Sequence, residues 1–354
     1  NGTAAVDTIT NATPVLAGIE KLNITTTDNY IVSALTSATA LTNVTVAGSG
    51  TTSITTGALA LNVNTTIDAS ASTGAVTIDA TAATANGLSI TGSATAVNIL
   101  TGNAAALDSV ITGGAAGDTL TGGAGDDTIV GSEGNNTIEV SDDNTDTGTD
   151  TVTAGNGHNT IGGDAGVDTV TVGNGYNTIV TLAGDDVITV GTGGNAINAG
   201  LGSDAITIGT NVAGVVNTIT QLITDSTVAS TDGTTATIVA GDTLTFATGS
   251  AGKVDVITGF TAGDVIDTGA GATTAAISMI GELTANLTDG NLFASGTYVA
   301  ATGVFTIVAD GTGADTMLMF SEAGTAASNV VATNTSAIIL VGVDSDILTA
   351  ANFI

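Results

Sequence analysis

The stretch that decides the fold reads Gly122-Gly-Ala-Gly125-Asp-Asp127-Thr-Ile129-Val130. It follows the pattern G-G-x-G-x-D-x-U-x, in which U is a large aliphatic residue. The same nine-residue frame runs through residues 113–207 in ten blocks, with one insertion of five residues at 140–144, and it defines an expected repeat domain of residues 113–208. Glycine-rich turns that alternate with short Thr- and Ile-rich runs predict a stack of short β-strands.

This stretch resembles the RTX calcium-binding repeats of proteins exported by Gram-negative type I secretion. The resemblance implies a right-handed parallel β-roll in which two nonapeptides make one turn. The first six residues of each nonapeptide would form a calcium-binding turn, and the last three a strand whose U side chain points inside. Calcium takes six to eight oxygen ligands, and glycine lets a turn present its carbonyl groups.

The resemblance implies several calcium ions as cofactors. The candidate ligands are the Asp at the sixth position of a block and the Gly at the fourth position: Asp118, Asp127, Asp150, Asp168, Asp186, Asp204, Gly125, Gly148, Gly166, Gly184 and Gly202.

If two blocks make one turn, the sixth positions form two rows. Blocks 18 residues apart then lie above one another, and the insertion leaves this order intact if it loops out. One side carries Asp127, Asp150, Asp168, Asp186 and Asp204, and the other carries Asp118, Asn136, Asn159, Asn177 and Asn195. We expect calcium on the Asp side and a largely metal-free Asn side, with His158 and Tyr176 stacked outside the latter.

A magnitude supports this division. Stacked strands lie ~4.8 Å apart, so stacked carboxylates repel by ~3.5 kcal/mol per neighbour at an effective dielectric constant of ~20. Cations between the rungs would cancel that repulsion, whereas neutral Asn side chains can hydrogen-bond up the stack. The alternative is ordinary turn chemistry, because Asp and Asn favour turns in any protein.

Residues 1–112 are expected to form a Thr- and Ala-rich β-helix or β-solenoid. Short runs such as Leu22-Asn-Ile24, Val44-Thr-Val46 and Val76-Thr-Ile78 each place two apolar side chains on one face. Their spacing is irregular, and a two-sheet sandwich is the alternative. The first residues lack the basic and apolar regions of an ordinary signal peptide, so we expect a processed N-terminus or a longer chain.

Residues 209–354 are expected to form a C-terminal β domain, because all six Phe residues lie between positions 246 and 353. The segment Asp255 to Asp267 resembles the D-x-I-x-x-F-x-x-G-D-x-I-D pattern that often follows RTX blocks, and it adds Asp264 to the candidate ligands. Residues 346–354 are similar to the uncleaved hydrophobic tail that type I exporters read. An edge strand with a terminal tail is the alternative. The complete fold class is therefore all-β, an elongated parallel β-solenoid followed by a C-terminal β domain.

Composition excludes several classes of function. The chain has 33 Asp and Glu against 2 Lys and Arg, a net charge of −31, no Cys and one His. Such a polyanion repels nucleic acid and anionic lipid, and no apolar run is long enough for a membrane helix. The sequence has no H-E-x-x-H, G-x-S-x-G or P-loop motif, so we expect no enzyme activity.

Two classes of function remain. The first is a structural protein of the cell surface of a Gram-negative bacterium, a self-assembling S-layer or filament subunit, because this Thr-, Ala- and Gly-rich composition resembles bacterial S-layer proteins with RTX blocks. The second is an RTX adhesin, or the calcium-binding secretion module of a larger exported protein. The expected partners are other copies of the chain, the type I exporter and a cell-surface polysaccharide.

Overall fold

The computed structural model describes residues 8–11, 16, 18–33, 35, 40–56, 64–84, 87–141, 144–202, 204–210, 215–220, 243–245, 255–261, 263–267, 278–280, 291–301, 304–308, 313–321, 335–344, 347–348 and 352. All regular structure in these residues is β-strand. The chain divides into two compact units, Asn1–Thr181 and Leu182–Ile354, and each is described by itself. The described residues contain no helix that is long and apolar enough to cross a membrane.

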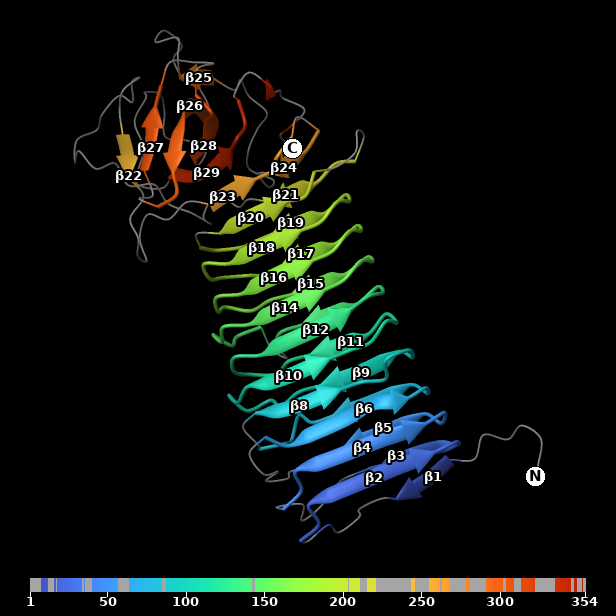
Figure 1. Cartoon of the computed structure of the whole chain (residues 1–354). Coiled ribbons are helices and arrows are strands. Elements are labelled where there is room, and N and C mark those ends of the chain that lie inside the picture. The colour runs from blue at the N-terminus through green and yellow to red at the C-terminus, as the bar shows by residue number, and fades with distance from the viewer. Residues whose placement is uncertain are drawn as a thin grey trace. The chain divides into compact units, whose positions relative to one another are not determined.

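The first unit is a parallel β-solenoid (Figure 1). Its odd-numbered strands form one parallel sheet and its even-numbered strands a second. The strands are β1 (Thr8–Asn11), β2 (Lys21–Thr26), β3 (Asn29–Val32), β4 (Asn43–Gly48), β5 (Thr52–Thr55), β6 (Thr66–Ser72), β7 (Val76–Asp79), β8 (Leu88–Thr91), β9 (Asn98–Thr101), β10 (Ser109–Thr112), β11 (Thr119–Thr121), β12 (Thr128–Ser132), β13 (Thr137–Glu139), β14 (Thr151–Ala154), β15 (Thr160–Gly162), β16 (Thr169–Val172) and β17 (Thr178–Val180).

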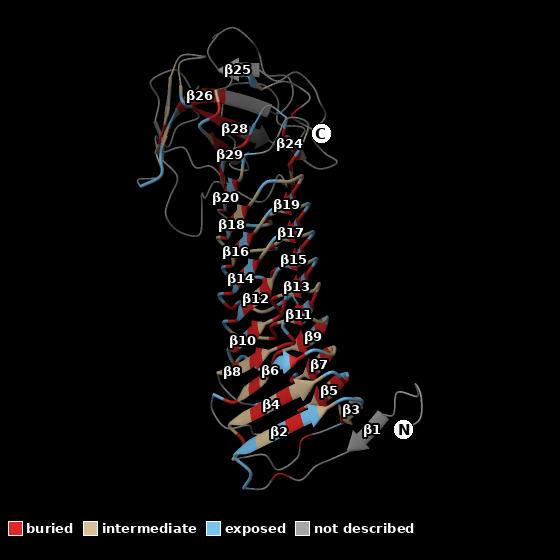
Figure 2. Cartoon of the chain, turned by 45° about the vertical axis from the view of Figure 1, so that its right-hand side comes forward, coloured by how far each residue is buried: buried red, intermediate tan, exposed pale blue. Residues whose placement is uncertain are grey.

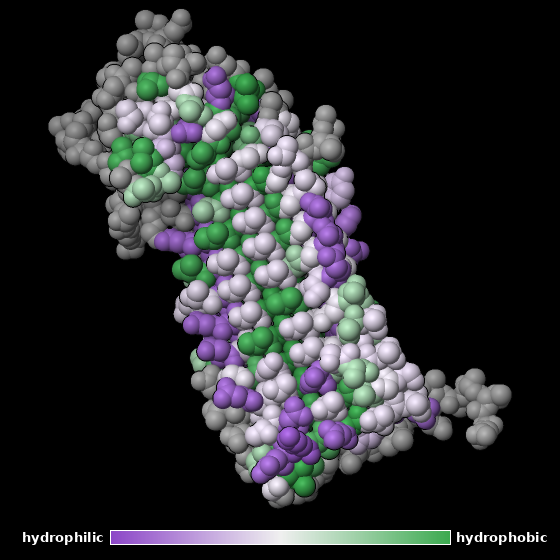
Figure 3. All heavy atoms as spheres, in the orientation of Figure 1, coloured by the Kyte–Doolittle hydropathy of each residue, from purple (hydrophilic) through white to green (hydrophobic). Residues whose placement is uncertain are grey.

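Where the nonapeptides run through this unit, its interior holds two aliphatic stacks built from their eighth position. In the second sheet Ile129 pairs with Val152, and Val152 with Val170. These side chains are at most 1% exposed, and Figure 2 shows the same alternation of buried and exposed residues along the strands. The neighbouring threonines point outward, so much of the outer surface in Figure 3 has intermediate hydropathy.

The N-terminal third continues the same ladder, which confirms the solenoid and rules out the sandwich. Strand β8 pairs in parallel with β10, and β10 pairs in parallel with β12, so Ile90, Ile111 and Ile129 form one row. The insertion at 140–144 leaves this register intact, because Thr128 pairs with Thr151 beyond it. The ladder of paired strands runs through the proposed domain boundary at residue 112 without a break. The boundary itself stays a prediction.

The second unit begins with parallel strands and ends in an antiparallel sheet. Strands β18, β20 and β23 form one parallel row, and β19, β21 and β24 another. Strand β29 pairs in parallel with β23 and antiparallel with β28, which joins the two parts. The strands are β18 (Val187–Val190), β19 (Ala196–Asn198), β20 (Ala205–Ile208), β21 (Thr218–Thr220), β22 (Thr243–Thr245), β23 (Asp255–Thr258), β24 (Val265–Asp267), β25 (Ser278–Ile280), β26 (Asn291–Val299), β27 (Val304–Ile307), β28 (Asp315–Ser321) and β29 (Thr335–Val341).

The strands β23 and β24 of the segment Asp255 to Asp267 thus add one further coil, that is, one full turn of the parallel strands. Sequence reasoning assigned it to the C-terminal β domain, whose boundary at residue 209 stays a prediction. The antiparallel part has the conventional core expected from its composition, with Phe305, Met317 and Ile338 fully buried. Most of the predicted secretion tail at 346–354 lies outside the described residues.

Candidate metal centre

A ladder of Asn side chains runs along one edge of the first unit. Oδ1 of Asn159 accepts the backbone N–H of Asn136 at 3.1 Å, and Oδ1 of Asn177 accepts that of Asn159 at 3.1 Å. The amide nitrogens repeat the contact, since Nδ2 of Asn136 and of Asn159 each donates to the next Oδ1 at 3.0 Å. All three side chains are 1% exposed. Each rung of this Asn ladder is therefore hydrogen-bonded to the next.

The same amide nitrogens also reach the turn carbonyls of their own block. Nδ2 of Asn136 donates to the carbonyl oxygens of Ser132 and Gly134 at 3.4 and 3.2 Å. Nδ2 of Asn159 donates to the carbonyl oxygen of Gly155 at 3.2 Å. A positively polarised NH₂ group thus lies between turn carbonyls and the Oδ1 of the next rung. Backbone carbonyl and side-chain carbonyl oxygens such as these are also the atoms that bind a hard cation.

The opposite edge carries Asp at the same position, with only part of these contacts. Oδ1 of Asp127 accepts the backbone N–H of Ser109 at 2.5 Å, and Oδ1 of Asp150 accepts that of Asp127 at 2.6 Å. In the second unit Oδ1 of Asp204 accepts the N–H of Asp186 at 2.9 Å. A carboxylate offers no N–H, and Oδ2 of Asp127, Asp150 and Asp204 is buried without a hydrogen-bond partner.

Burial changes the protonation of these acids. Burial raises the pKa of Asp127 to about 8 and that of Asp150 to about 7, and neighbouring carboxylates add to both shifts. Burial also raises the pKa of Asp204 to about 9, with the carboxylate of Asp255 as the next cause. A buried carboxylate with few hydrogen-bond donors stays ionised at neutral pH only if a positive charge is near it. These residues therefore fit a bound cation, and the pure oxygen donor set fits calcium.

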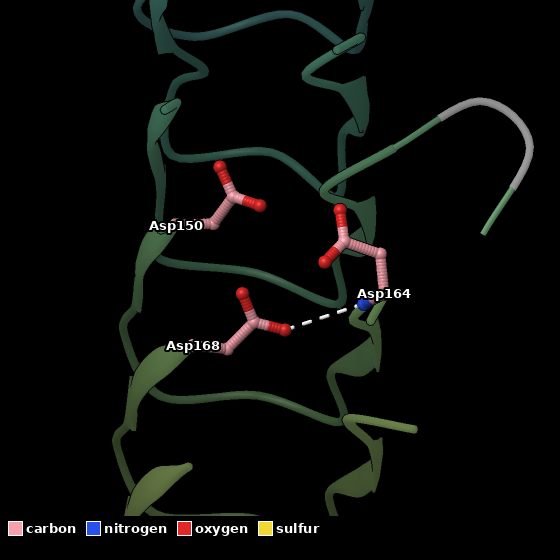
Figure 4. Close-up of side chains that lie close together, drawn as sticks. All are labelled: Asp150, Asp164 and Asp168. Carbon is pink, nitrogen blue, oxygen red and sulfur yellow. Dashed lines mark hydrogen bonds between the residues drawn. The ribbon is translucent and has the colours of Figure 1, made fainter. Parts of the chain in front are cut away.

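Three carboxylates converge at one point of this Asp ladder (Figure 4). One oxygen each of Asp150, Asp164 and Asp168 lies within 4.8 Å of the others, and all three residues are at most 1% exposed. Oδ1 of Asp164 accepts the backbone N–H of Gly166 at 2.8 Å, and the N–H of Asp164 donates to Oδ2 of Asp168 at 3.3 Å. Since Ca–O distances are ~2.3–2.6 Å, a single ion can contact oxygens that are ~4.8 Å apart.

Two residues of the Asp edge were missed from the sequence. Asp164 stands at the second position of its block, where the pattern has Gly, and its charge was the available signal. Asp255 extends the ladder in the second unit, because its Oδ1 accepts the N–H of Asp204 at 2.9 Å. It lies 51 residues beyond Asp204, so the 18-residue spacing gave no indication of this pairing.

Two predicted ligands lie in the Asn row, where N–H and O–H donors surround them. Asp118 accepts three N–H bonds, from the backbone and Nδ2 of Asn98 and from Gly114, at 2.6–2.9 Å. Asp264 accepts the backbone N–H and Nδ2 of Asn217 on Oδ1, and the N–H and O–H of Thr261 on Oδ2. Their role as calcium ligands stays a prediction. The donors around them set them apart from Asp127 and Asp150.

The fourth-position glycines allow adjacent turns to approach closely. Gly125, Gly184 and Gly202 have backbone φ angles of 107°, 154° and 149°, which residues other than glycine rarely adopt. At Gly166 the constraint is contact, because a Cβ atom there would overlap the carbonyl oxygen of Gly148. The ligand roles of the five fourth-position glycines and of the sixth-position Asp residues, Asp168 and Asp186 included, stay predictions.

His158 and Tyr176 stack on the outside of the Asn edge, as expected. Their ring centroids are 5.3 Å apart with an interplanar angle of 48°. Tyr176 is 57% exposed. The two rings lie on the surface of the turns and are not members of the Asn or Asp ladder.

Comparison with known families identifies the repeat. The RTX calcium-binding nonapeptide repeat family model, four copies long, matches residues 107–138, 144–179 and 173–206. Searches of the curated proteins and of the solved structures found no match. The matched residues contain both ladders of the first unit and the convergent Asp150, Asp164 and Asp168. The chain is therefore an RTX-repeat protein, and its nonapeptides form a parallel β-roll.

Proposed function

We propose that this protein is a calcium-dependent extracellular structural protein, a subunit of a self-assembling surface layer (S-layer) or filament. One observation carries the proposal: buried carboxylates of the Asp ladder, such as Asp127 and Asp150, have an oxygen without a hydrogen-bond partner. RTX repeats bind calcium and are typical of exported proteins. The ladder therefore supports a chain that folds where calcium is abundant.

The electrostatics supply the folding switch. Without cations, the stacked carboxylates of Asp127, Asp150 and Asp168 repel one another in a buried environment. Calcium supplies the compensating charge when bound, and its binding free energy adds to that of folding. The side chains of the Asp ladder would hold the ions from below and above, and the fourth-position glycines would bring turn carbonyls near them.

The structural role rests on the fold and on the composition. The RTX β-roll is a structural fold, and we propose no catalytic activity for the chain. With 33 acids and 2 basic residues, copies of the chain repel one another until divalent cations bridge their acidic surfaces. The proposed partners are therefore other copies of the chain, with the type I exporter and a cell-surface polysaccharide of a Gram-negative bacterium as further partners.

Electron microscopy with and without calcium tests the proposal. Purified protein in millimolar calcium should form sheets or filaments, and a calcium chelator should disperse them. Magnesium at the same concentration is the control for charge screening, since Mg²⁺ demands octahedral geometry and gives up its water reluctantly. Circular dichroism on the same samples reports whether the chain folds.

The outcomes separate the candidate functions. Calcium-dependent lattices or filaments support the structural protein. Folded monomers that bind a glycan or a cell surface support the RTX adhesin, and folded monomers without either property support a secretion module of a larger protein. A chain that folds equally well in chelator contradicts the calcium switch itself.

A further inference from the structure

We propose that Asp150, Asp164 and Asp168 form a separate cation site, the tightest of the roll and the one that prefers trivalent ions. The inference rests on the calcium binding proposed above and adds a ranking among the sites. It identifies the second-position Asp164, which the nonapeptide pattern does not require, as the residue that sets the site apart.

The geometry brings three negative groups to one point. The carboxylate oxygens of Asp150, Asp164 and Asp168 lie within 4.8 Å of one another, and the three residues are at most 1% exposed. In Figure 4 the carboxylates of Asp150 and Asp168 extend toward that of Asp164, which comes from the facing side of the coil. Oδ2 of Asp150 has no hydrogen-bond partner. This buried oxygen requires a positive neighbour, and the cluster offers no N–H to it.

The other turns of the Asp edge have no such third carboxylate. The second positions of their blocks are Gly123, Asp146, Leu182 and Gly200. Asp146 differs from Asp164 because it is half-buried, and its two oxygens accept the N–H groups of Thr147 and Gly125 at 2.8 and 2.6 Å. Among the residues that the structure describes, only Asp150, Asp164 and Asp168 form a group of three acids with this spacing.

Charge count sets the expected selectivity. Oxygen-ligand sites bind calcium over several orders of magnitude in affinity, depending on the number of charged ligands and on the rigidity of the site. Three carboxylates leave a net charge of −1 around Ca²⁺ and zero around a trivalent cation of similar size, such as La³⁺. Because the site is buried, this difference is screened less than it would be at the surface. Calcium should therefore fill this site before the other sites of the roll, and the site should bind La³⁺ more tightly than Ca²⁺.

Calcium titration against a fluorescent chelator of known affinity tests the ranking. The wild-type chain should show one ion bound at least about tenfold more tightly than the rest, and La³⁺ should displace that ion first. Asp164→Asn keeps an oxygen for the Gly166 N–H and removes the charge, so it should abolish the tight class and leave the weaker ions in place. Asp146→Asn, the same charge change one coil earlier, should retain the tight class.

The folded state of each variant is checked by circular dichroism in saturating calcium. If Asp164→Asn does not fold, Asp164→Gly replaces it, because Gly stands at this position in the turns at 123 and 200. A wild-type isotherm that persists in the Asp164 variant overturns the inference, and so does equal loss of the tight ion in Asp146→Asn. In both cases the remaining calcium binding leaves the proposed function standing. A wild-type chain that binds no calcium overturns both.

Discussion

The choice between one amide and one carboxylate decides how each edge of the roll is held together. Asn159 and Asp150 occupy equivalent positions of the nonapeptide, and both accept a backbone N–H from the preceding rung. Only Asn159 returns a donor, through Nδ2, to the next rung. Exchange of that NH₂ group for an oxygen converts a self-sufficient rung into one that needs a cation. The edges thus use the same backbone with different dependence on metal.

Asn159→Asp tests this equivalence. In chelator the variant should be less stable by ~1–3 kcal/mol, because a buried hydrogen bond is lost and an acceptor faces Oδ1 of Asn177. Calcium should restore part of the loss by occupying the place of the amide. Urea unfolding in chelator and in calcium measures both effects. Asn135→Asp is the matched control, since this exposed side chain keeps its acceptor for the His158 N–H; an equal loss there would contradict the ladder argument.

The raised pKa values of the Asp edge predict how pH acts on the metal-free fold. Asp127 and Asp150 have folded pKa values of about 8 and about 7 against an ordinary value of 3.8. Between these limits the folded state binds more protons than the unfolded state, so its stability falls as pH rises from about 4 to about 8. Thermal unfolding in chelator at pH 5, 6, 7 and 8 should show this decline.

Calcium reverses that trend, because it binds the ionised carboxylates and releases their protons. Calcium affinity should therefore increase from pH 6 to pH 8. The double variant Asp127→Asn with Asp150→Asn should flatten both profiles. A chelated wild-type protein whose stability increases over this range would contradict the assignment of buried, ionisable carboxyl groups.

Each turn of the roll depends on close contact with the turn below it. The carbonyl oxygen of Gly148 lies where a side chain at residue 166 would have to begin. The turn at Gly166 also orients Asp164, whose Oδ1 accepts the Gly166 N–H. The glycine therefore fixes both the spacing of two coils and the position of a candidate ligand.

Gly166→Ala should separate these coils and lower the melting temperature in calcium. Inserting even one methyl group into a well-packed contact costs about 1–3 kcal/mol. Gly263→Ala is the control, because its nearest neighbour would be the Thr261 Oγ1 at 4.0 Å and its backbone is not in the left-handed region. Equal melting temperatures for wild type and Gly166→Ala, measured by calorimetry, would refute the close contact.

The two ends of the first unit differ in their need for metal. Between residues 43 and 101 the buried polar side chains of the described residues are neutral: Thr52, Thr56, Thr65, Ser72, Ser93 and Asn98. Beyond Asp118, the row of Asp127, Asp150 and Asp168 places a buried acid in each successive coil. The N-terminal coils are thus held by aliphatic packing and hydrogen bonds, and the later coils also carry the buried charge.

Hydrogen exchange in chelator should make this difference visible. Amides of β4–β9 should keep their protection, because removal of calcium leaves their contacts unchanged. Amides of β14 and β16, which follow Asp150 and Asp168, should exchange faster and regain protection when calcium is added. Uniform exchange along the first unit in both conditions would count against calcium as the element that orders the later coils.

Much of this could be predicted from the sequence, for identifiable reasons. The glycine frame and the eighth-position aliphatics repeat at fixed intervals, so the two rows that begin at Asp127 and at Asp118 follow from counting, once the resemblance to RTX repeats implies that two blocks make one turn. Asp164 did not follow, because it breaks the local pattern and one of its partners, Asp150, lies in the preceding coil. Asp255 was missed for a related reason, because 51 residues separate it from Asp204. Only the folded chain shows that the backbone N–H of Asp204 donates to Oδ1 of Asp255.

The fixed offset of 18 residues between Thr151 and Thr169 has a consequence for size. Coils of this kind meet the coils above and below in the same strand register, so a duplicated coil, such as residues 155–172, could form the same backbone pairings. Each added copy would lengthen the roll by ~4.8 Å, the distance between neighbouring strands. The length of the roll is therefore set by its number of coils, and gene duplication can increase it in equal steps without a new core.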